Sequence, residues 1–319
     1  IIISATLGIV SYYAVHESIQ RSLRSRLALA RIISNYVEVF LNNNLYRLKD
    51  ISLPSTIDRD HYDWKREKRM LETVYKYSLF TEGVFLLDKH GNELLTYPPH
   101  VDYFTNLTYI TYVNQVLQTG MPVISNVYTI EPIKKKVIFM MTPLRDSEGR
   151  INGIAGGILG PTEHFLNELL QSGKVETKNY VEIIDSNETV VASDNPSRVF
   201  QHHAHDGNLG KMIMDGKAGI LPCKHGFSHP DALKRPTDRL AFVPLSVAKW
   251  GVIVGEDERD IFGPASGLEK KFFLLVFIFI GTSALFSIVA SMNIVKPLRS
   301  LIASSNKIAS GDPSTPVGD

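Results

Sequence analysis

The chain has 319 residues, and its 34 basic and 33 acidic side chains nearly cancel, which leaves a formal net charge of +1. This balance gives no sign of the strongly basic surface that is typical of nucleic-acid-binding domains, so we expect no nucleic-acid partner. The single cysteine, Cys223, excludes a disulfide within the chain.

The first 15 residues are apolar and are predicted to be the remnant of a first transmembrane helix. The run IIISATLGIVSYYAV is shorter than the roughly 20 residues that cross a bilayer as a helix. It also lacks the basic residues that precede the apolar core of a signal peptide. We therefore interpret residues 1–15 as the end of a truncated membrane helix, with an ordinary buried N-terminal helix as the alternative.

Residues 16–52 are predicted to continue as a long stalk helix. No Gly or Pro occurs between Gly8 and Pro54, so nothing in this stretch breaks a helix strongly. A second helix is predicted over 57–77. Apolar residues recur at helical spacings in both segments: Leu29, Ile33, Tyr36, Phe40, Leu41, Leu45 and Leu48 in the first, and Trp64, Leu71, Val74 and Tyr75 in the second.

Four later segments each consist of two apolar runs around a turn, which predicts β-hairpins. They cover residues 83–98, 137–160, 179–193 and 239–257. The turns that start at Asp88 and Asp146 both read D-x-x-G, whereas the turn that starts at Asp185 keeps the Asp and has Glu in place of Gly. In such turns Asp accepts hydrogen bonds from nearby backbone, and Gly supplies a positive φ.

The order of these elements indicates an internal duplication. The first unit, residues 53–174, reads helix, hairpin, loop with a short helix, hairpin, and the second, residues 175–262, reads hairpin, loop, hairpin. Antiparallel sheets with segregated helices define the α+β class. We therefore predict an α+β fold with a long N-terminal helix, two tandem antiparallel-sheet units and flanking transmembrane helices.

A second transmembrane helix is predicted over residues 263–295. The 24 residues 272–295 carry no charge, with Lys270 and Lys271 at one edge and Lys296 and Arg299 at the other. This length suffices to cross a bilayer, and a buried core helix is the alternative. With two spans, residues 16–271 lie outside the cytoplasm and both termini inside, in agreement with the basic residues after the second span.

Residues 296–319 follow this helix, and a heptad pattern runs from Ile294 into them. Apolar or small residues recur at spacings of four and three, which predicts packing in a parallel helical bundle: Ile294, Leu298, Leu301, Ser305 and Ile308. Pro297 is placed where a kink between membrane and cytoplasmic helices is tolerated. Gly311 is placed as a helix stop.

Residues 16–262 resemble the double Cache sensor domain, whose two units are PAS-like. Tyr112, Leu117, Thr119 and Gly120 match a motif of its first unit, and Pro143, Asp146, Gly149 and Gly153 match the hairpin that closes that unit. Pro244, Leu245, Trp250 and Gly251 match the end of the second unit, with Trp and Gly in reversed order. The resemblance implies a membrane-distal unit, a membrane-proximal unit and a ligand bound in the distal one.

Residues 296–319 resemble the start of a HAMP linker, although Pro313 departs from its pattern. The matching residues are Pro297, Leu298, Leu301, Ile308, Ala309, Gly311 and Asp312. The two resemblances together imply the sensor half of a homodimeric receptor in the bacterial inner membrane, in contact with membrane lipid. Pro297, Leu298, Leu301 and Ile308 are its expected signal-relay residues. The expected output is a histidine kinase, with a chemoreceptor or a diguanylate cyclase as alternatives.

The expected ligand site lies in the segment 98–131, which is rich in aromatic residues. Small-molecule sites combine apolar walls with a few polar groups, and the candidates here are Asp102, Tyr103, Tyr109, Tyr112, Asn126 and Tyr128. Amino-acid-binding relatives carry an Arg at the position of Ile110, and no Lys or Arg occurs between Pro98 and Pro132. We therefore expect a neutral or cationic ligand; ordinary core and surface aromatics are the alternative.

A second candidate site is a loop rich in His, for which a metal-responsive sensor is the corresponding function. His202, His203, His205, Cys223, His225 and His229 lie within 28 residues, and imidazole and thiol groups bind zinc or copper. Their spacing matches no closed metal motif, so a polar loop is the alternative. The chain carries no P-loop, H-E-x-x-H, G-x-S-x-G or kinase motif, and we expect neither a catalytic site nor a cofactor within it.

Overall fold

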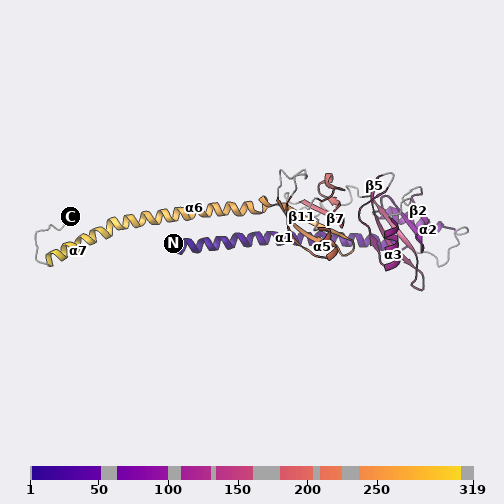
Figure 1. The fold of residues 1–319 in the computed structure, drawn as a ribbon, viewed down its shortest axis with the longest axis horizontal. Helices are drawn as coiled ribbons and strands as arrows, with labels where there is room; N and C mark the ends of the chain where they lie inside the picture. Colours follow the sequence, from indigo (N-terminus) through magenta and orange to yellow (C-terminus); the bar gives the residue numbers. More distant parts are fainter. Residues whose placement is uncertain are drawn as a thin grey trace. The chain divides into compact units, whose positions relative to one another are not determined.

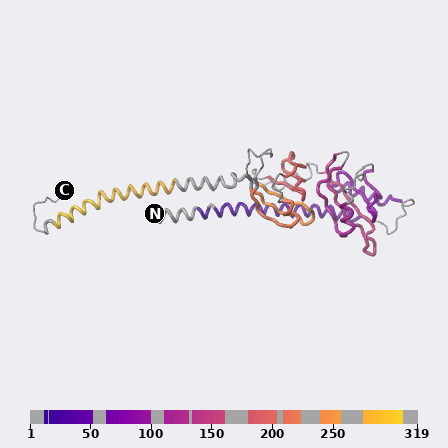
Figure 2. The backbone as a smooth tube through the Cα atoms, in the orientation of Figure 1, coloured from indigo at the N-terminus to yellow at the C-terminus, as the bar shows by residue number. Residues whose placement is uncertain are grey.

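The computed structural model describes residues 2–51, 63–99, 109–130, 134–160, 180–203, 209–224 and 237–309. The chain divides into two compact units, which are Arg21–Ile261 and the combination of Ile1–Gln20 with Phe262–Asp319 (Figures 1 and 2). The first unit contains both β-sheets and most of the long helix α1 (Ile2–Lys49).

The first sheet is antiparallel throughout, with strand order β2-β1-β6-β5-β3 and with β4 also paired to β5. It follows helix α2 (Lys65–Tyr77) and includes helix α3 (Tyr109–Thr119) between its second and third strands. We call the described residues 63–160 the first sheet domain. Its strands are β1 (Gly83–Asp88), β2 (Glu93–Tyr97), β3 (Val123–Ile124), β4 (Tyr128–Ile130), β5 (Lys135–Arg145) and β6 (Ile151–Leu159).

The second sheet repeats this topology, with strand order β8-β7-β11-β10-β9. We call the described residues 180–257 the second sheet domain. Its helix α5 (Leu209–Asp215) lies between the second and third strands of the domain, as α3 does in the first. The four predicted hairpins and the predicted duplication are therefore confirmed. The strands are β7 (Tyr180–Asp185), β8 (Val190–Ser193), β9 (Gly219–Lys224), β10 (Thr237–Pro244) and β11 (Trp250–Asp257), and a 3-10 turn covers Pro196–Arg198.

Helix α1 packs against one face of both sheets and shares a single hydrophobic core with them. Its buried residues recur at spacings of three and four, so they form one stripe along the helix. The prediction that Tyr36 belongs to this stripe is wrong, because its side chain is 56% exposed and Val37 takes the inward position. The buried set is Ala30, Ile33, Ser34, Val37, Leu41, Asn44, Leu45 and Leu48.

The opposite face of each sheet carries its own small core. In the first sheet domain, Val113 and Val116 of α3 pack with Phe85, Phe139 and other strand residues. In the second, Leu209 and Ile213 of α5 pack against β7, β10 and β11. Each sheet is thus covered by α1 on one face and by a short helix on the other, as expected for an α+β fold.

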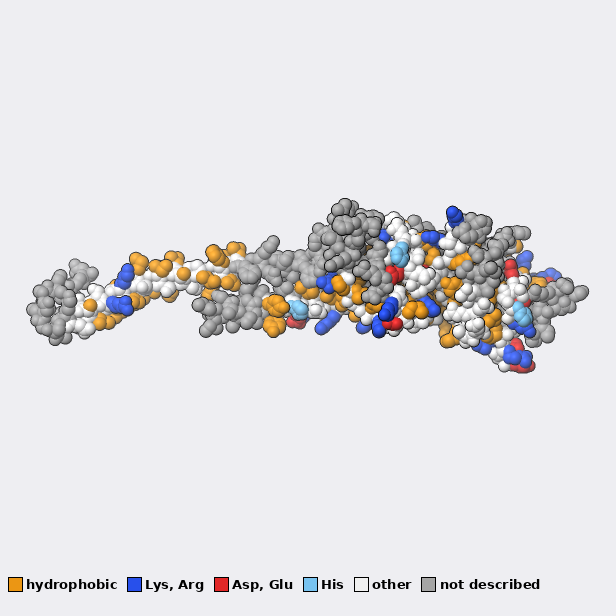
Figure 3. Space-filling model, in the orientation of Figure 1, with side chains coloured by type: hydrophobic (Ala, Val, Ile, Leu, Met, Phe, Trp, Pro, Cys, Tyr) orange, Lys and Arg blue, Asp and Glu red, His pale blue; other side chains and the backbone are white. Residues whose placement is uncertain are grey.

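The second unit consists mainly of helix α6 (Glu258–Ala290), a five-residue π-helical turn (Ser291–Val295) and helix α7 (Lys296–Ala309). Among the described residues, the helical stretch Leu274–Asn306 is long and apolar enough to cross a membrane. Its apolar side chains are exposed, as Figure 3 shows along α6. The side chains of residues 2–11 lie outside the description, so the predicted first span remains a prediction.

Candidate functional site

Three of the six predicted ligand residues have described side chains. Tyr112 lies on α3, Asn126 lies between β3 and β4, and Tyr128 lies on β4. Tyr112 and Tyr128 pack against the core between α3 and the first sheet. Asn126 lies at the edge of this face. Asp102 and Tyr103 lie outside the described residues, and only the backbone of Tyr109 is described.

Tyr128 has a buried hydroxyl group with no hydrogen-bond partner among the described residues. Its ring packs against Phe139, with 5.7 Å between ring centroids, and both belong to the core beneath α3. A buried polar atom that lacks a partner costs roughly 1–3 kcal/mol, so such atoms call for an explanation. A ligand that accepts or donates a hydrogen bond at this hydroxyl is one explanation.

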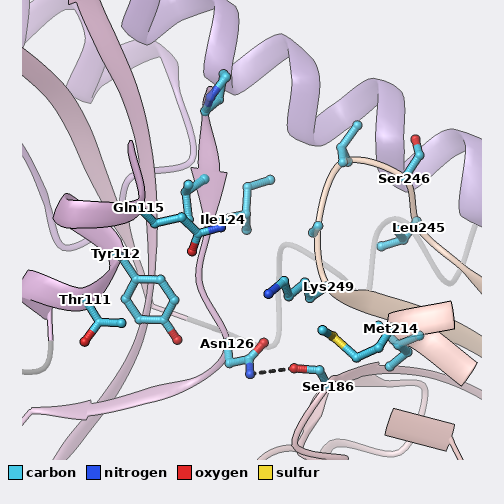
Figure 4. Close-up of a pocket in the computed structure, with 15 residues that line it drawn as sticks. Thr111, Tyr112, Gln115, Ile124, Asn126, Ser186, Met214, Leu245, Ser246 and Lys249 are labelled. Atoms are coloured by element: carbon cyan, nitrogen blue, oxygen red, sulfur yellow. Dashed lines mark hydrogen bonds between the residues drawn. The ribbon is translucent and has the colours of Figure 1, made fainter. Parts of the chain in front are cut away.

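Tyr112 and Asn126 line a cavity of about 540 Å³ that lies between the two sheet domains (Figure 4). We call it the junction cavity. Burial raises the pKa of the Tyr112 hydroxyl, the backbone of Asn126 lowers it through a hydrogen bond, and the charge of Asp185 raises it further. The first sheet domain also contributes Thr111, Gln115, Pro122, Val123 and Ile124, and the second contributes Ser186, Ile213, Met214 and Leu245 to Lys249.

The segment Ser125–Val127 is held by the second sheet domain at each of its three residues. The indole Nε1 of Trp250 donates to the carbonyl oxygen of Ser125 at 3.1 Å. The Asn126 Nδ2 donates to the Ser186 Oγ at 2.8 Å, as drawn in Figure 4. The backbone N–H of Val127 donates to Asp185 Oδ2 at 2.9 Å. This segment therefore couples the predicted ligand residues of the first domain to the sheet of the second.

Asp185 is fully buried at this junction, and its carboxylate accepts three backbone hydrogen bonds. Its Oδ1 accepts from Asn187 N and Thr189 N, each at 2.9 Å, within its own turn. Burial raises the pKa of the Asp185 carboxyl, and the backbone N–H donors counteract this effect. Because both oxygens are engaged, Asp185 fixes the turn and the neighbouring domain together.

His203, a member of the predicted metal set, belongs to a buried polar cluster in the second sheet domain. The side chain of His203 is 2% exposed, and its Nδ1 lies 2.7 Å from Glu182 Oε2. Arg198 Nε donates to Glu182 Oε1 at 3.0 Å. Among the described side chains, no group of three or more His, Cys, Asp and Glu is arranged to bind a metal ion.

The other members of the predicted metal set give little support within the described residues. His202 is exposed, and its backbone forms a bridge with Thr189. His205, His225 and His229 lie outside the described residues, as does the side chain of Cys223. His203 contacts the Glu182 carboxylate instead. Of the six predicted metal ligands, this leaves the exposed His202 and four residues whose side chains are not described.

The predicted signal-relay residues lie on α7, immediately after the π-helical turn. Pro297 lacks the backbone N–H that a regular helix requires, which accounts for an irregular turn just before it. Leu298 and Leu301 are 52% and 54% exposed, so their apolar stripe has no partner among the described residues. The side chain of Ile308 lies outside the description.

Sequence reasoning missed the part of the junction that the second sheet domain contributes. Ser186 and Asp185 were predicted only as turn residues, and Lys249 was not singled out. Contacts such as Asn126–Ser186 join residues 60 positions apart. A long-range pairing of this kind leaves no periodic signal within either segment.

Comparison with known proteins identifies the sensor domain. The family model dCache_1, a Cache domain, matches residues 13–265. No curated protein sequence matches the chain.

Several solved structures share the fold. The ligand-binding domain of the Campylobacter jejuni chemoreceptor Tlp3, solved with L-valine, is 15% identical and has a TM-score of 0.53 over 79% of this chain and 98% of its own. The extracellular domain of the putative histidine kinase mmHK1S-Z2 is 11% identical, with a TM-score of 0.52 over 77% and 99%. An extracellular ligand binding receptor from Desulfohalobium retbaense is 10% identical, with a TM-score of 0.48, and the match covers 72% of this chain but only 39% of the receptor.

Proposed function

Because the chain belongs to the dCache_1 family of Cache domains, we propose that it is the ligand-sensing and signal-transmitting portion of a bacterial receptor in the inner membrane. Its extracytoplasmic sensor domain is followed by one candidate membrane helix. In this proposal the first sheet domain is membrane-distal and binds a small molecule. The second sheet domain is membrane-proximal, and its last strand, β11, leads without a break into α6.

The buried hydroxyl of Tyr128 is the observation that carries the ligand proposal. It lies in the core beneath α3, next to the aromatic ring of Phe139. A neutral or cationic ligand suits this site, because aromatic faces attract cations and a tyrosine hydroxyl both donates and accepts hydrogen bonds. Asp102, Tyr103 and Tyr109, which lie in or next to the preceding undescribed segment, are proposed to complete the site. Tlp3 was solved with L-valine, a zwitterionic amino acid, whereas this chain has Ile110 at the expected carboxylate-binding position.

A thermal-shift screen of the full chain in detergent tests this proposal. The library contains primary and quaternary amines, neutral purines and carboxylates. We expect at least one neutral or cationic compound to raise the melting temperature, and Tyr128→Phe to weaken its binding about tenfold, a typical cost of one lost hydrogen bond. Tyr77→Phe removes an exposed hydroxyl from α2 and serves as the matched control. An unchanged Kd in Tyr128→Phe would contradict the proposed site.

The receptor is proposed to be a homodimeric histidine kinase with a HAMP linker. A chemoreceptor and a diguanylate cyclase are the alternatives. The heptad spacing of Ile294, Leu298 and Leu301 on exposed positions supports pairing with a second copy. Helix α1 carries a similar exposed stripe of Ile32, Tyr36, Val39 and Tyr46, at spacings of four, three and seven. Cysteine cross-linking at Leu301 in membranes tests the pairing, with the neighbouring exposed Arg299 as the control position.

A further inference from the structure

We propose that the junction cavity is a second ligand site and that it binds a small monocarboxylate whose negative charge is paired with Lys249. This site differs from the one proposed at Tyr128 in position and in ligand charge. Its walls come from both sheet domains, so it exists only where these domains meet. The proposal does not depend on the identity of the ligand in the first sheet domain.

The size and walls of the junction cavity suit a small organic molecule. Its volume of about 540 Å³ lies within the roughly 300–1,000 Å³ of ligand pockets. Ile124, Met214, Leu245 and Val247 give it apolar surface on both sides. A short aliphatic chain or a single aromatic ring can bury its apolar surface here, which favours binding by about 25 cal/mol per Å².

Lys249 is the one charged residue among the fifteen described residues that line the cavity. Its ammonium group extends from the β10–β11 loop into the cavity, opposite Tyr112 and Asn126 (Figure 4). Among the described residues, no carboxylate forms an ion pair with it. An ammonium group at the edge of an apolar cavity attracts an anion and disfavours a cation.

Two acidic residues that adjoin this lining, Asp185 and Glu38, are already engaged by backbone donors. Asp185 accepts hydrogen bonds from Val127, Asn187 and Thr189 through its two oxygens. Glu38 of α1 accepts a hydrogen bond from the backbone N–H of Ser246. Both carboxylates are therefore held in place by the protein, and Lys249 remains available to a ligand.

Polar side chains beside Lys249 supply further hydrogen bonds to a carboxylate. The Ser186 Oγ accepts from Asn126 Nδ2, so its own hydroxyl hydrogen is available to a second acceptor. The side chain of Gln115 reaches the same cavity from α3. A carboxylate with one ammonium partner and one or two neutral donors is a satisfied arrangement, since charge-assisted hydrogen bonds are the stronger kind.

Ligand binding in the junction cavity is coupled to signal transmission through the strand and helix that follow Lys249. The loop that bears Lys249 leads directly into β11, and β11 continues into α6. A molecule that contacts both Lys249 and α3 stabilises the arrangement of the two sheet domains in which it fits. It thereby shifts the population of that arrangement, as any ligand with differential affinity does.

Isothermal titration of the full chain in detergent micelles tests the inference, with butyrate and benzoate as probes. Butyramide and benzamide have nearly the same shape without the charge. We expect saturable binding of at least one carboxylate and binding of its amide that is at least tenfold weaker. Lys249→Met is expected to weaken carboxylate binding at least tenfold. Lys211→Met serves as the control, because Lys211 is an exposed lysine of α5 outside the cavity lining.

Three results would overturn the inference: no saturable binding of either carboxylate, equal affinity for carboxylate and amide, or an unchanged Kd in Lys249→Met. Lys249 is exposed, so its replacement is not expected to unfold the domain. Tyr128→Phe separates the two proposed sites. It should leave carboxylate binding unchanged, and a loss of carboxylate binding in this variant alone would assign the anion to the first sheet domain.

Discussion

Acidification from pH 5 to pH 2 is expected to lower the free energy of unfolding of this chain through one buried carboxylate, Glu182. The Glu182 side chain is 2% exposed and is contacted by Arg198 and His203. Burial alone would raise the pKa of Glu182, but the hydrogen bonds and charges of His203 and Arg198 outweigh it and lower the pKa from 4.5 to about 2. Ser193 Oγ lies within 3.4 Å of the same carboxylate.

The sign and size of the effect follow from proton linkage. Because the folded state has the lower pKa, the unfolded state binds more protons between pH 4.5 and pH 2, and stability falls as the pH falls through this range. A shift from 4.5 to about 2 corresponds to roughly 3 kcal/mol, at about 1.4 kcal/mol per pH unit. This contribution is complete above about pH 5 and is lost near pH 2.

The measurement compares wild type with Glu182→Gln, which lacks the titrating group. Urea unfolding of the full chain in a non-ionic detergent is followed by tryptophan fluorescence, since Trp250 is 1% exposed in the same sheet. At neutral pH the variant should be less stable, because it leaves the buried Arg198 without its carboxylate. The stability gap between the two proteins should then shrink by about 3 kcal/mol between pH 5 and pH 2.

A constant gap across this pH range would refute the reasoning, since it would mean that Glu182 titrates equally in both states. Other carboxylates also protonate in this window, so the absolute stability of wild type is not the test. Glu148→Gln provides the control, because Glu148 is an exposed carboxylate on the β5–β6 turn. Its gap to wild type should not change with pH in the same way.

Two further changes test the core and the junction. Trp250→Phe removes the donor to the Ser125 carbonyl and should cost about 1–3 kcal/mol of unfolding free energy, with the half-buried Trp64→Phe as a control for the loss of an indole. Gly156→Ala would place a Cβ 2.1 Å from the Phe85 ring and should lower the free energy of unfolding by about 1–3 kcal/mol. Phe85→Leu should restore part of this loss. Gly219→Ala, whose added Cβ would lie 3.8 Å from its nearest neighbour, should have a much smaller effect in the same urea titrations.

The hairpins could be predicted because their turns contain local chemistry. Asp146 Oδ1 accepts from the backbone N–H groups of Glu148 and Arg150, and Asp88 and Asp185 make the equivalent bonds. Gly149 takes φ +80°, as the D-x-x-G pattern predicts. In the third turn Glu188 occupies the same left-handed region at φ +60°, so the Asp suffices to specify the turn without glycine.

The long helix and its buried face could be predicted only in part. The absence of Gly and Pro predicted the helix, and the apolar spacing predicted Leu41, Leu45 and Leu48 as buried, which is confirmed. Tyr36 was assigned to the wrong face because α1 carries apolar residues on two sides. Its inward stripe also includes Ser34 and Asn44, whose polar side chains carry no hydrophobic signal.

The junction could not be predicted, because its contacts depend on how two duplicated domains meet. Trp250 and Ser125 are 125 positions apart, and their hydrogen bond has no counterpart in local sequence. Of the three predicted ligand residues whose side chains are described, Tyr112 and Asn126 line the junction cavity and Tyr128 does not. Lys249 resembles any surface lysine until the fold places it opposite α3.

The two equivalent turns of the duplicated domains show how a turn aspartate can also hold a neighbouring domain. Asp88 and Asp185 occupy equivalent turns, and in each the Oδ1 atom accepts two backbone hydrogen bonds from the turn. In the first sheet domain Asp88 Oδ2 accepts from the side chain of Asn92 within the same turn. In the second, Asp185 Oδ2 accepts from Val127 of the other domain. The turn needs only one carboxylate oxygen, so the second oxygen can bind another part of the protein without weakening the hairpin. An aspartate that specifies a turn through one carboxylate oxygen can therefore hold a second domain through the other.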